Sequence, residues 1–203
     1  MSANWVEHDH GALYPHTAVA APIEGSDIDT DQILPARFMH KRRLDYGQYC
    51  SHDQRFYSTG KPRTEFVLNR PGFRKAAILV ADRNFGCGSS REQAVHTLAD
   101  FGIRSVIAVS FGDIFQTNCL KNGLLPVTLP AEAVRSLRAS LAASPGLPLT
   151  VDLETEQVIE SDGTAYAFSV DPFGRTCLLA GLDEIDYTLT LLDRVSDFES
   201  EQE

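Results

Sequence analysis

Cysteine is scarce in this chain, and its four copies stand far apart. Cys50, Cys87, Cys119 and Cys177 occur singly among 203 residues, with no Cys-x-x-Cys pair. This spacing favours reduced thiols in a cytoplasm over a disulfide framework or a metal site. We therefore expect a chain that binds no metal or cofactor of its own.

Positive charge is also in short supply. The sequence has 18 lysines and arginines against 28 aspartates and glutamates, which gives a formal net charge of −10. Such a balance repels phosphate backbones, so we expect no nucleic-acid partner. The densest basic stretch, Lys41-Arg42-Arg43, is too short to form a binding surface by itself, and a solvated loop is its simpler interpretation.

Long apolar runs and a targeting segment are missing as well. No window reaches the roughly 20 apolar residues of a membrane span. Residues 1–16 lack both the basic start and the apolar stretch of a signal peptide. We expect no membrane partner and a cytoplasmic location.

The order of apolar and polar residues indicates an α/β protein. A continuous apolar run at residues 76–81 predicts a strand that is buried on both faces. Helical spacing follows at Glu92–Phe101, and Gly102 is expected to end that helix. Alternating strands and helices imply parallel pairing. Further strands are predicted at 18–23, 105–111, 124–129 and 165–170, a hairpin at 149–153 with 157–160, and helices at 113–122, 131–143 and 181–198.

These elements predict one α/β domain over residues 1–203, with a parallel strand–helix core and an added β-hairpin region. We expect an N-terminal extension at 1–17 and a disordered tail at 200–203. Residues 34–61 form a long polar segment with little periodicity. Loops of this length are usually lids, binding loops or linkers, and the aromatic content here favours some order.

The most informative segment is DRNFGCGSSRE, at residues 82–92, between a predicted strand and helix. Ligands of open α/β sheets bind beyond the carboxyl ends of the strands. The glycines let the backbone approach a ligand, and a helix N-terminus with Arg91 suits a carboxylate. One alternative needs no catalysis, because Ser89-x-x-Glu92 is also a capping box. A Cys87 thiolate is another possibility, although a small buried residue is the simpler interpretation.

Asp29 and Asp31 flank Thr30 in a turn-rich segment. We predict that one of them caps the turn that follows, since no further oxygen ligands suit a hard metal ion. A dinucleotide loop, a phosphate-binding Walker loop and a nucleophile elbow are all excluded by sequence. For Ser89 to act as a base, its alkoxide would need stabilisation from helix donors and Arg91. Removing a proton next to a substrate carboxylate, with loss of a substrate hydroxyl, also requires an acid or a Lewis acid for that hydroxyl. The sequence offers neither here, so the segment resembles half of an active site.

Four separated motifs occur in order: DTDQI at 29–33, FGCGSSRE at 85–92, a stretch at 112–126 and another at 181–190. Over about residues 18–199 they resemble the small subunits of 3-isopropylmalate dehydratase, within the aconitase swivel-domain group. The resemblance implies a swivelling β/β/α fold and a large partner subunit, in a heterodimer or heterotetramer, that carries a four-iron four-sulfur cluster. It further implies a dicarboxylate substrate, 2-isopropylmalate, which is dehydrated to an alkene dicarboxylate and rehydrated to 3-isopropylmalate in leucine biosynthesis.

Carried over residue by residue, the resemblance makes Ser89 the catalytic base and gives Ser90 and Arg91 to substrate binding. The stretch at 43–47 matches the family's specificity region, so Arg43, and after it Arg42, becomes a substrate contact. Roles in bracing the cleft are implied for six further residues: Asp29, Thr30, Asp31, Gly86, Gly88 and Glu92.

Departures from the family pattern lie near the expected substrate. Gln93 stands where histidine is usual, and Leu44-Asp45 replace Thr-Gly. They leave open a related hydro-lyase for another substituted malate or maleate, such as methylmalate, citraconate or dimethylmaleate. A non-catalytic binding module is the alternative from another class, and the acidic balance speaks against it. A stand-alone serine hydrolase is the weakest choice.

Overall fold

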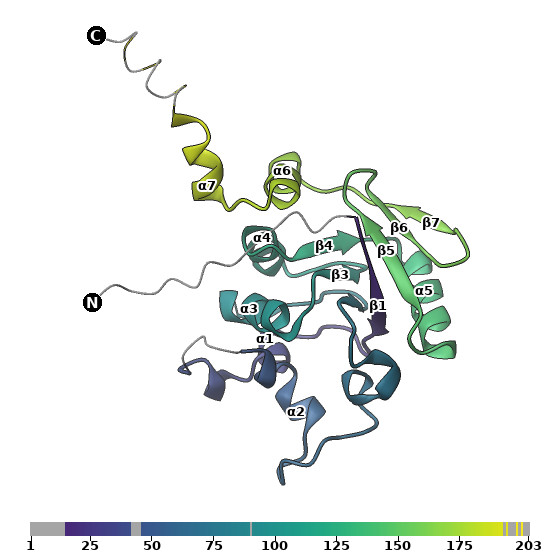
Figure 1. Cartoon of the computed structure of the whole chain (residues 1–203). Coiled ribbons are helices and arrows are strands. Elements are labelled where there is room, and N and C mark those ends of the chain that lie inside the picture. Colours follow the sequence, from purple (N-terminus) through teal and green to yellow (C-terminus); the bar gives the residue numbers. More distant parts are fainter. Residues whose placement is uncertain are drawn as a thin grey trace.

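The computed structural model describes residues 15–41, 46–89, 91–192, 194, 198 and 200. Its centre is one sheet of seven strands in the order β4-β3-β2-β1-β5-β6-β7 (Figure 1). The strands are β1 (His16–Pro22), β2 (Ile78–Val80), β3 (Ser105–Ala108), β4 (Leu125–Thr128), β5 (Pro148–Asp152), β6 (Gln157–Ile159) and β7 (Ala165–Ala167).

Strands β1 to β4 are parallel, as the sequence predicts. All three residues of β2 and all four of β3 are buried, which explains their unbroken apolar character. Side chains alternate between the two faces of the sheet: Leu79 belongs to one core cluster, and Ile78 and Val80 belong to the other. The predicted apolar runs are confirmed, although β2 and β3 are shorter than expected.

The predicted hairpin is also confirmed. Strands β5 and β6 pair antiparallel, β7 adds to β6, and β5 pairs antiparallel with β1. The hairpin therefore extends the parallel sheet on the far side of β1. Because β1 begins at His16, the predicted N-terminal extension to residue 17 is two residues too long; residues 1–14 lie outside the described part.

Helices cover both faces of the sheet. Residues of α3 (Glu92–Phe101) and α4 (Asp113–Lys121) pack in one core cluster, and residues of α5 (Ala131–Ala143) pack in the other together with the hairpin. Gly102 ends α3 with φ of 104°, as predicted. No helix in the described part of the chain is long and apolar enough to span a membrane.

The end of the chain departs from the single helix predicted at 181–198. Helix α6 (Pro172–Ala180) was not predicted, and Gly181 ends it with φ of 67°. Helix α7 (Glu184–Leu189) starts afresh behind Asp183, whose side chain accepts a hydrogen bond from the Asp186 amide. Asp171 followed by proline is a helix start signal, and the sequence prediction overlooked it.

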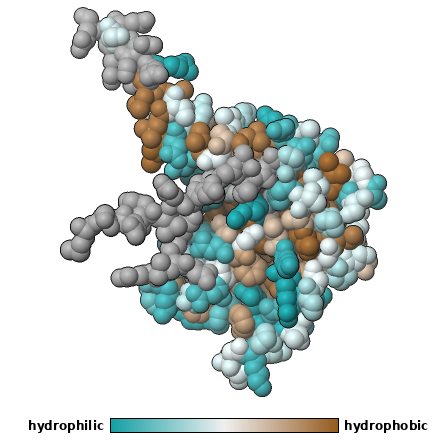
Figure 2. Space-filling model, in the orientation of Figure 1, coloured by the Kyte–Doolittle hydropathy of each residue, from teal (hydrophilic) through white to brown (hydrophobic). Residues whose placement is uncertain are grey.

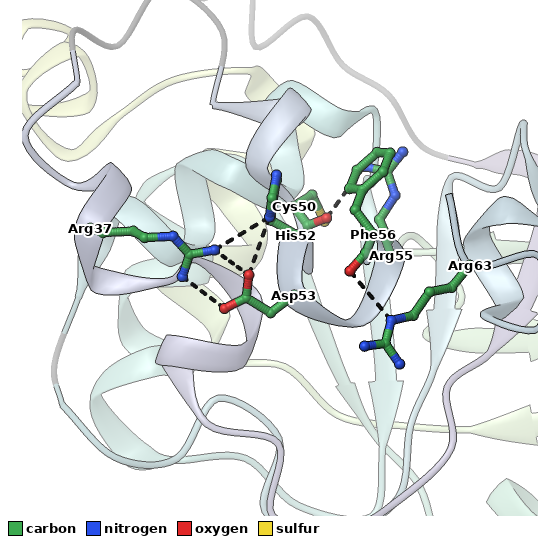
Figure 3. A network of polar contacts seen from close by, with 7 residues as sticks. All are labelled: Arg37, Cys50, His52, Asp53, Arg55, Phe56 and Arg63. Carbon is green, nitrogen blue, oxygen red and sulfur yellow. Dashed lines mark hydrogen bonds and ion pairs between the residues drawn. The ribbon is translucent and has the colours of Figure 1, made fainter. Parts of the chain in front are cut away.

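The segment 34–61 contains short helices. They are η1 (Ala36–Phe38), η2 (Gly47–Tyr49) and α2 (His52–Arg55), and η3 (Val67–Asn69) and η4 (Pro71–Phe73) follow. Arg37 of η1 binds Asp53 of α2, and His52 Nδ1 lies 3.2 Å from the same carboxylate (Figure 3). The Arg37 guanidinium lowers the pKa of Asp53 to about 2. This ion pair fixes η1 and α2 relative to each other.

Candidate functional site

The glycine-rich segment after β2 is held between two other stretches of backbone. On one side, Gly86 N donates to Ile28 O at 2.7 Å, and Thr30 N donates to Cys87 O at 3.0 Å. On the other side, Phe85 N donates to Ser110 O at 3.0 Å. Short parallel bridges on both sides fix the segment as an extension of the sheet beyond its carboxyl edge.

Two glycines are required by close packing at this place. Gly86 has φ of 73°, and a Cβ on it would lie 2.2 Å from the ring of Phe115. A Cβ on Gly112 would lie 2.7 Å from the Gly86 carbonyl oxygen. Phe115 stacks edge-on against Phe85 at 5.6 Å, so an aromatic cluster supports the loop from beneath. The sequence predicted that these glycines let a ligand approach the backbone. In the structure, the groups that lie against Gly86 and Gly112 belong to the protein itself.

Ser89 does not cap α3, so the capping-box interpretation of Ser89-x-x-Glu92 is wrong. The N-cap is Arg91, with extended backbone and no side-chain cap. Ser89 is exposed, and no described residue forms a hydrogen bond with its hydroxyl. Ser89 therefore has no role as a helix cap, and its hydroxyl is available to a ligand.

A capping box does occur on the facing segment, at α1 (Thr30–Ile33). Asp29 accepts a hydrogen bond from Gln32 N at 2.8 Å, and Gln32 Oε1 accepts from Asp29 N at 3.3 Å. The prediction that one aspartate of this motif is an N-cap is confirmed. The residue after it, Thr30, is buried and donates from Oγ1 to Ser89 O at 2.9 Å. The motif at 29–31 thus contacts the serine loop directly.

Arg91 and Asp31 form an ion pair between the two motifs. The arginine side chain is only 17% exposed, whereas that of the aspartate is 51% exposed. The guanidinium donates through Nη1, so the structure assigns Arg91 a carboxylate partner from its own chain. The pair lies at the loop that carries Ser89, where the sequence predicted a substrate carboxylate.

A cavity of about 260 Å³ opens over the serine loop. It lies between that loop and the first turn of α4, whose N-terminus carries a partial positive charge. Nine residues line it: Asn84, Gly86, Cys87, Gly88, Ser89, Gly112, Asp113, Ile114 and Phe115. Its volume suits a small organic acid rather than a polymer or a nucleotide.

Two carboxylates outside the cavity lining, Asp27 and Asp29, affect the thiol of Cys87, which lines the cavity. Partial burial, Asp29 and Asp27 raise the pKa of Cys87 above its usual range. Cys87 is therefore a neutral thiol, and it is partly exposed rather than buried as expected. The positive charge near Ser89 comes from the Arg91 guanidinium, which pairs with Asp31, and from the N-terminus of α4.

Glu92 binds a residue that sequence reasoning missed. Asn122 Nδ2 donates to Glu92 Oε1 at 3.0 Å, and Asn122 Oδ1 lies 2.8 Å from His96 Nε2. Asn122 follows α4, so this contact ties the first turn of α3 to the end of α4. Asn122 precedes Gly123, and from the sequence this pair indicated only the end of a helix.

The structure brings together five of the predicted residues that share the loop and its facing segment: Asp29, Thr30, Asp31, Ser89 and Arg91. Gly86 and Gly88 shape the same loop, and a Cβ on Gly88 would lie 3.4 Å from Asp29 Cβ. Ser90, Arg42 and Arg43 lie outside the described residues.

Comparison with known proteins identifies the family to which the chain is similar. The family model of the aconitase C-terminal domain matches residues 13–132, and a second model, LeuD_N, matches residues 135–172. The chain is 44% identical over 197 residues to the 3-isopropylmalate dehydratase small subunit of Methylibium petroleiphilum, covering 92% of this chain and 91% of the relative. It is 45% identical to the protein of the same name from Psychromonas ingrahamii, covering 94% of this chain and 95% of the relative.

A solved structure agrees with these relatives. The 3-isopropylmalate dehydratase (leuD) of Methanocaldococcus jannaschii superposes with a TM-score of 0.62 at 26% identity, covering 92% of this chain and 98% of that one. The protein is thus an aconitase C-terminal-type domain with a curled, mixed seven-stranded sheet. More particularly, the chain belongs to the family of 3-isopropylmalate dehydratase small subunits. The resemblance noted from the sequence motifs is confirmed.

Proposed function

We propose that this chain is the small subunit of a two-subunit hydro-lyase that isomerises 2-isopropylmalate to 3-isopropylmalate in leucine biosynthesis. Family membership supports the reaction class, and the cavity beside Ser89 supports a substrate of small dicarboxylate size. The observation that carries the proposal is the arrangement of Ser89: an exposed hydroxyl, on a loop fixed from both sides, that caps no helix. The reaction takes place in the cytoplasm.

Ser89 is the base that removes the proton from the substrate carbon. An ordinary hydroxyl holds its proton near neutrality, so catalysis requires positive charge close to the alkoxide. In this chain the Arg91 guanidinium and the N-terminus of α4 lie at the site, and Asp31 already engages Arg91. A partner that covers the cavity would exclude water and so strengthen these interactions at Ser89.

The substrate carboxylates are bound by Arg91 and Ser90, with Arg43, and secondarily Arg42, reaching in from the specificity region. Arg91 already engages a carboxylate, Asp31, through one terminal nitrogen. A planar guanidinium has further donors that can receive a substrate carboxylate while this pair persists. Asp31 then acts as the residue that orients Arg91.

The second half of the active site lies on a large subunit. The chemistry still required is a Lewis acid for the departing hydroxyl, which a four-iron four-sulfur cluster on that subunit supplies. No group of three or more potential ligands occurs among the described residues of this chain. The protein therefore contributes the base, the carboxylate contacts and the walls of the pocket.

The test is reconstitution. The chain is combined anaerobically with the cognate large subunit, and turnover is followed by alkene absorbance. The signal rises for 2-isopropylmalate and methylmalate, which are dehydrated, and falls for citraconate and dimethylmaleate, which are alkenes and are hydrated. We expect 2-isopropylmalate to be turned over fastest, and Ser89→Ala to remove turnover. Ser140→Ala, on α5 at the opposite face of the sheet, is the control and should retain it.

The outcomes separate the alternatives. Faster turnover of a smaller acid with the same Ser89 dependence would keep the mechanism and reassign the substrate. No turnover of any acid by a complex with an intact cluster would contradict the proposed function.

A further inference from the structure

Exposed apolar side chains are concentrated at one end of the molecule. Apart from Tyr57, every large hydrophobic residue that is exposed in the described part of the chain lies on α4, on α6 or in the C-terminal segment. These residues are Ile114, Phe173, Ile185, Leu189, Leu192 and Phe198. Exposed apolar side chains that gather on neighbouring elements are typical of an interaction site.

Helix α7 is attached by one side and presents the other. Tyr187 packs edge-on against Phe173 at 5.1 Å and so fastens α7 to α6. Ile185 and Leu189 lie one helical turn apart on the side of α7 opposite Tyr187, and Ile185 is 70% exposed. Leu192, also exposed, follows shortly after the helix. Figure 1 shows α7 projecting beyond α6, away from the sheet, and Figure 2 shows apolar residues gathered along this projection.

The exposed side of α4 connects this projection with the Ser89 cavity. Ile114 lines the Ser89 cavity. Thr117 and Lys121, one and two turns further along, line a second hollow of about 310 Å³. Phe173 and Leu182 line that hollow from the other side and lead into α7. One face therefore runs from the active-site loop to the tip of the C-terminal helix.

We propose that this face, from Ile114 through the hollow to Leu189 and Leu192, is a docking surface for the large subunit. The inference rests on the proposed function, in which a partner must cover the Ser89 cavity. Because the apolar face begins at that cavity, the same partner continues along it.

Charge favours the large subunit over a second copy of the chain. Asp171 and Asp183 line the hollow and outnumber its one cationic lining residue, Lys121, and Asp186 lies on α7. Two copies would bring these carboxylates together, each on a chain of formal net charge −10. Like charges facing one another across an interface oppose association. The surface therefore fits a partner with an apolar ridge and basic residues around it.

The experiment measures the dissociation constant between the full-length chain and the cluster-loaded large subunit. Leu189→Asp places a charge in the apolar stripe, and we expect it to weaken binding about 10- to 100-fold, as for a buried interface anchor. Thr190→Asp adds the same charge at the C-cap of α7, outside this stripe, and should change affinity by less than about threefold. Leu189→Met should bind like the parent chain.

The results distinguish this surface from the proposed function. Unchanged affinity of Leu189→Asp, with normal folding by circular dichroism, would overturn the docking surface even if the complex is active. Self-association of the parent chain that Leu189→Asp abolishes, with unchanged affinity for the large subunit, would also overturn it. A selective loss of affinity together with no turnover by the parent complex would keep the surface and reject the hydro-lyase proposal.

Discussion

Thr30 holds the loop that carries Ser89. Its Oγ1 donates to Ser89 O at 2.9 Å, and its amide donates to Cys87 O at 3.0 Å. The threonine side chain is buried, so this link is protected from water. One residue of the DTDQI motif thus fixes two carbonyl oxygens of the FGCGSSRE motif, and the two motifs act as one unit.

We expect Thr30→Val to lower kcat about tenfold with little change in KM, because a loosened Ser89 is misplaced for proton transfer. The substitution keeps the shape but removes the donor, so the free energy of unfolding should fall by about 1 kcal/mol. Steady-state kinetics of the reconstituted complex and urea unfolding of the chain measure the two effects. Thr30→Ser restores a hydroxyl and should recover most of kcat. An unaltered kcat in Thr30→Val would show that this link is not needed for catalysis.

The Arg91 contact predicts a different kinetic signature. Arg91→Lys removes the planar fork, and we expect kcat/KM to fall about 10- to 100-fold, mainly through a higher KM. Arg83→Lys is the matched control. Arg83 lies on the same loop, but it is well exposed, and its Nη2 lies 3.8 Å from Asp27 Oδ2, too far for a hydrogen bond. Its kinetics should stay close to those of the parent. Equal effects of both substitutions would show that the loss is not specific to Arg91 and would contradict a bidentate carboxylate contact there.

Much of the fold was predictable because apolar periodicity reports burial. The buried runs at β2 and β3 and the amphipathic pattern of α5 gave the strands, the helices and their parallel order. Helix α6 was missed because its start signal is a single Asp171-Pro172 pair, and its residues were left unassigned between the predicted strand at 165–170 and the predicted helix at 181–198. Short turns such as α2 lack enough residues to show a period.

The site was predictable in composition but not in pairing. The sequence located Ser89 and Arg91 on a loop after a buried strand. It did not show that Arg91 binds Asp31, which is 60 residues away, or that the capping box belongs to Asp29 and not to Ser89. Both facts depend on how two distant segments meet, and local spacing carries no information about that.

Gly86 gives a prediction about stability. Alanine there would require φ near 73° and would place Cβ 2.2 Å from the Phe115 ring. We expect Gly86→Ala to lower the free energy of unfolding by about 3 kcal/mol or more, from backbone strain and steric overlap together.

Gly163→Ala separates these two causes. Gly163 has φ of 92°, and a Cβ there would meet no atom within 4 Å. Only backbone strain of about 1 kcal/mol is then expected. Urea unfolding of both variants measures the difference, and similar losses for the two would show that the contact with Phe115 relaxes without cost.

His16 in β1 makes stability depend on pH. Burial, with a smaller contribution from Arg104, lowers the pKa of His16 to about 4. The unfolded chain, with a histidine pKa near 6.5, binds more protons than the folded chain between these two values. Stability from neutral His16 is therefore complete above pH 6.5 and is lost as the pH falls toward 4. After allowance for partial solvent exposure, the loss should be about 1 to 2 kcal/mol.

The measurement is the difference in unfolding free energy between the parent chain and His16→Gln across pH 4 to 7. Other groups titrate in both proteins and cancel in the difference, so the remaining pH dependence belongs to His16. We expect the parent to lose stability relative to the variant as the pH falls through this range. Parallel curves would mean that His16 becomes protonated in the folded chain as readily as in the unfolded one, and that β1 opens enough for water to reach the imidazole.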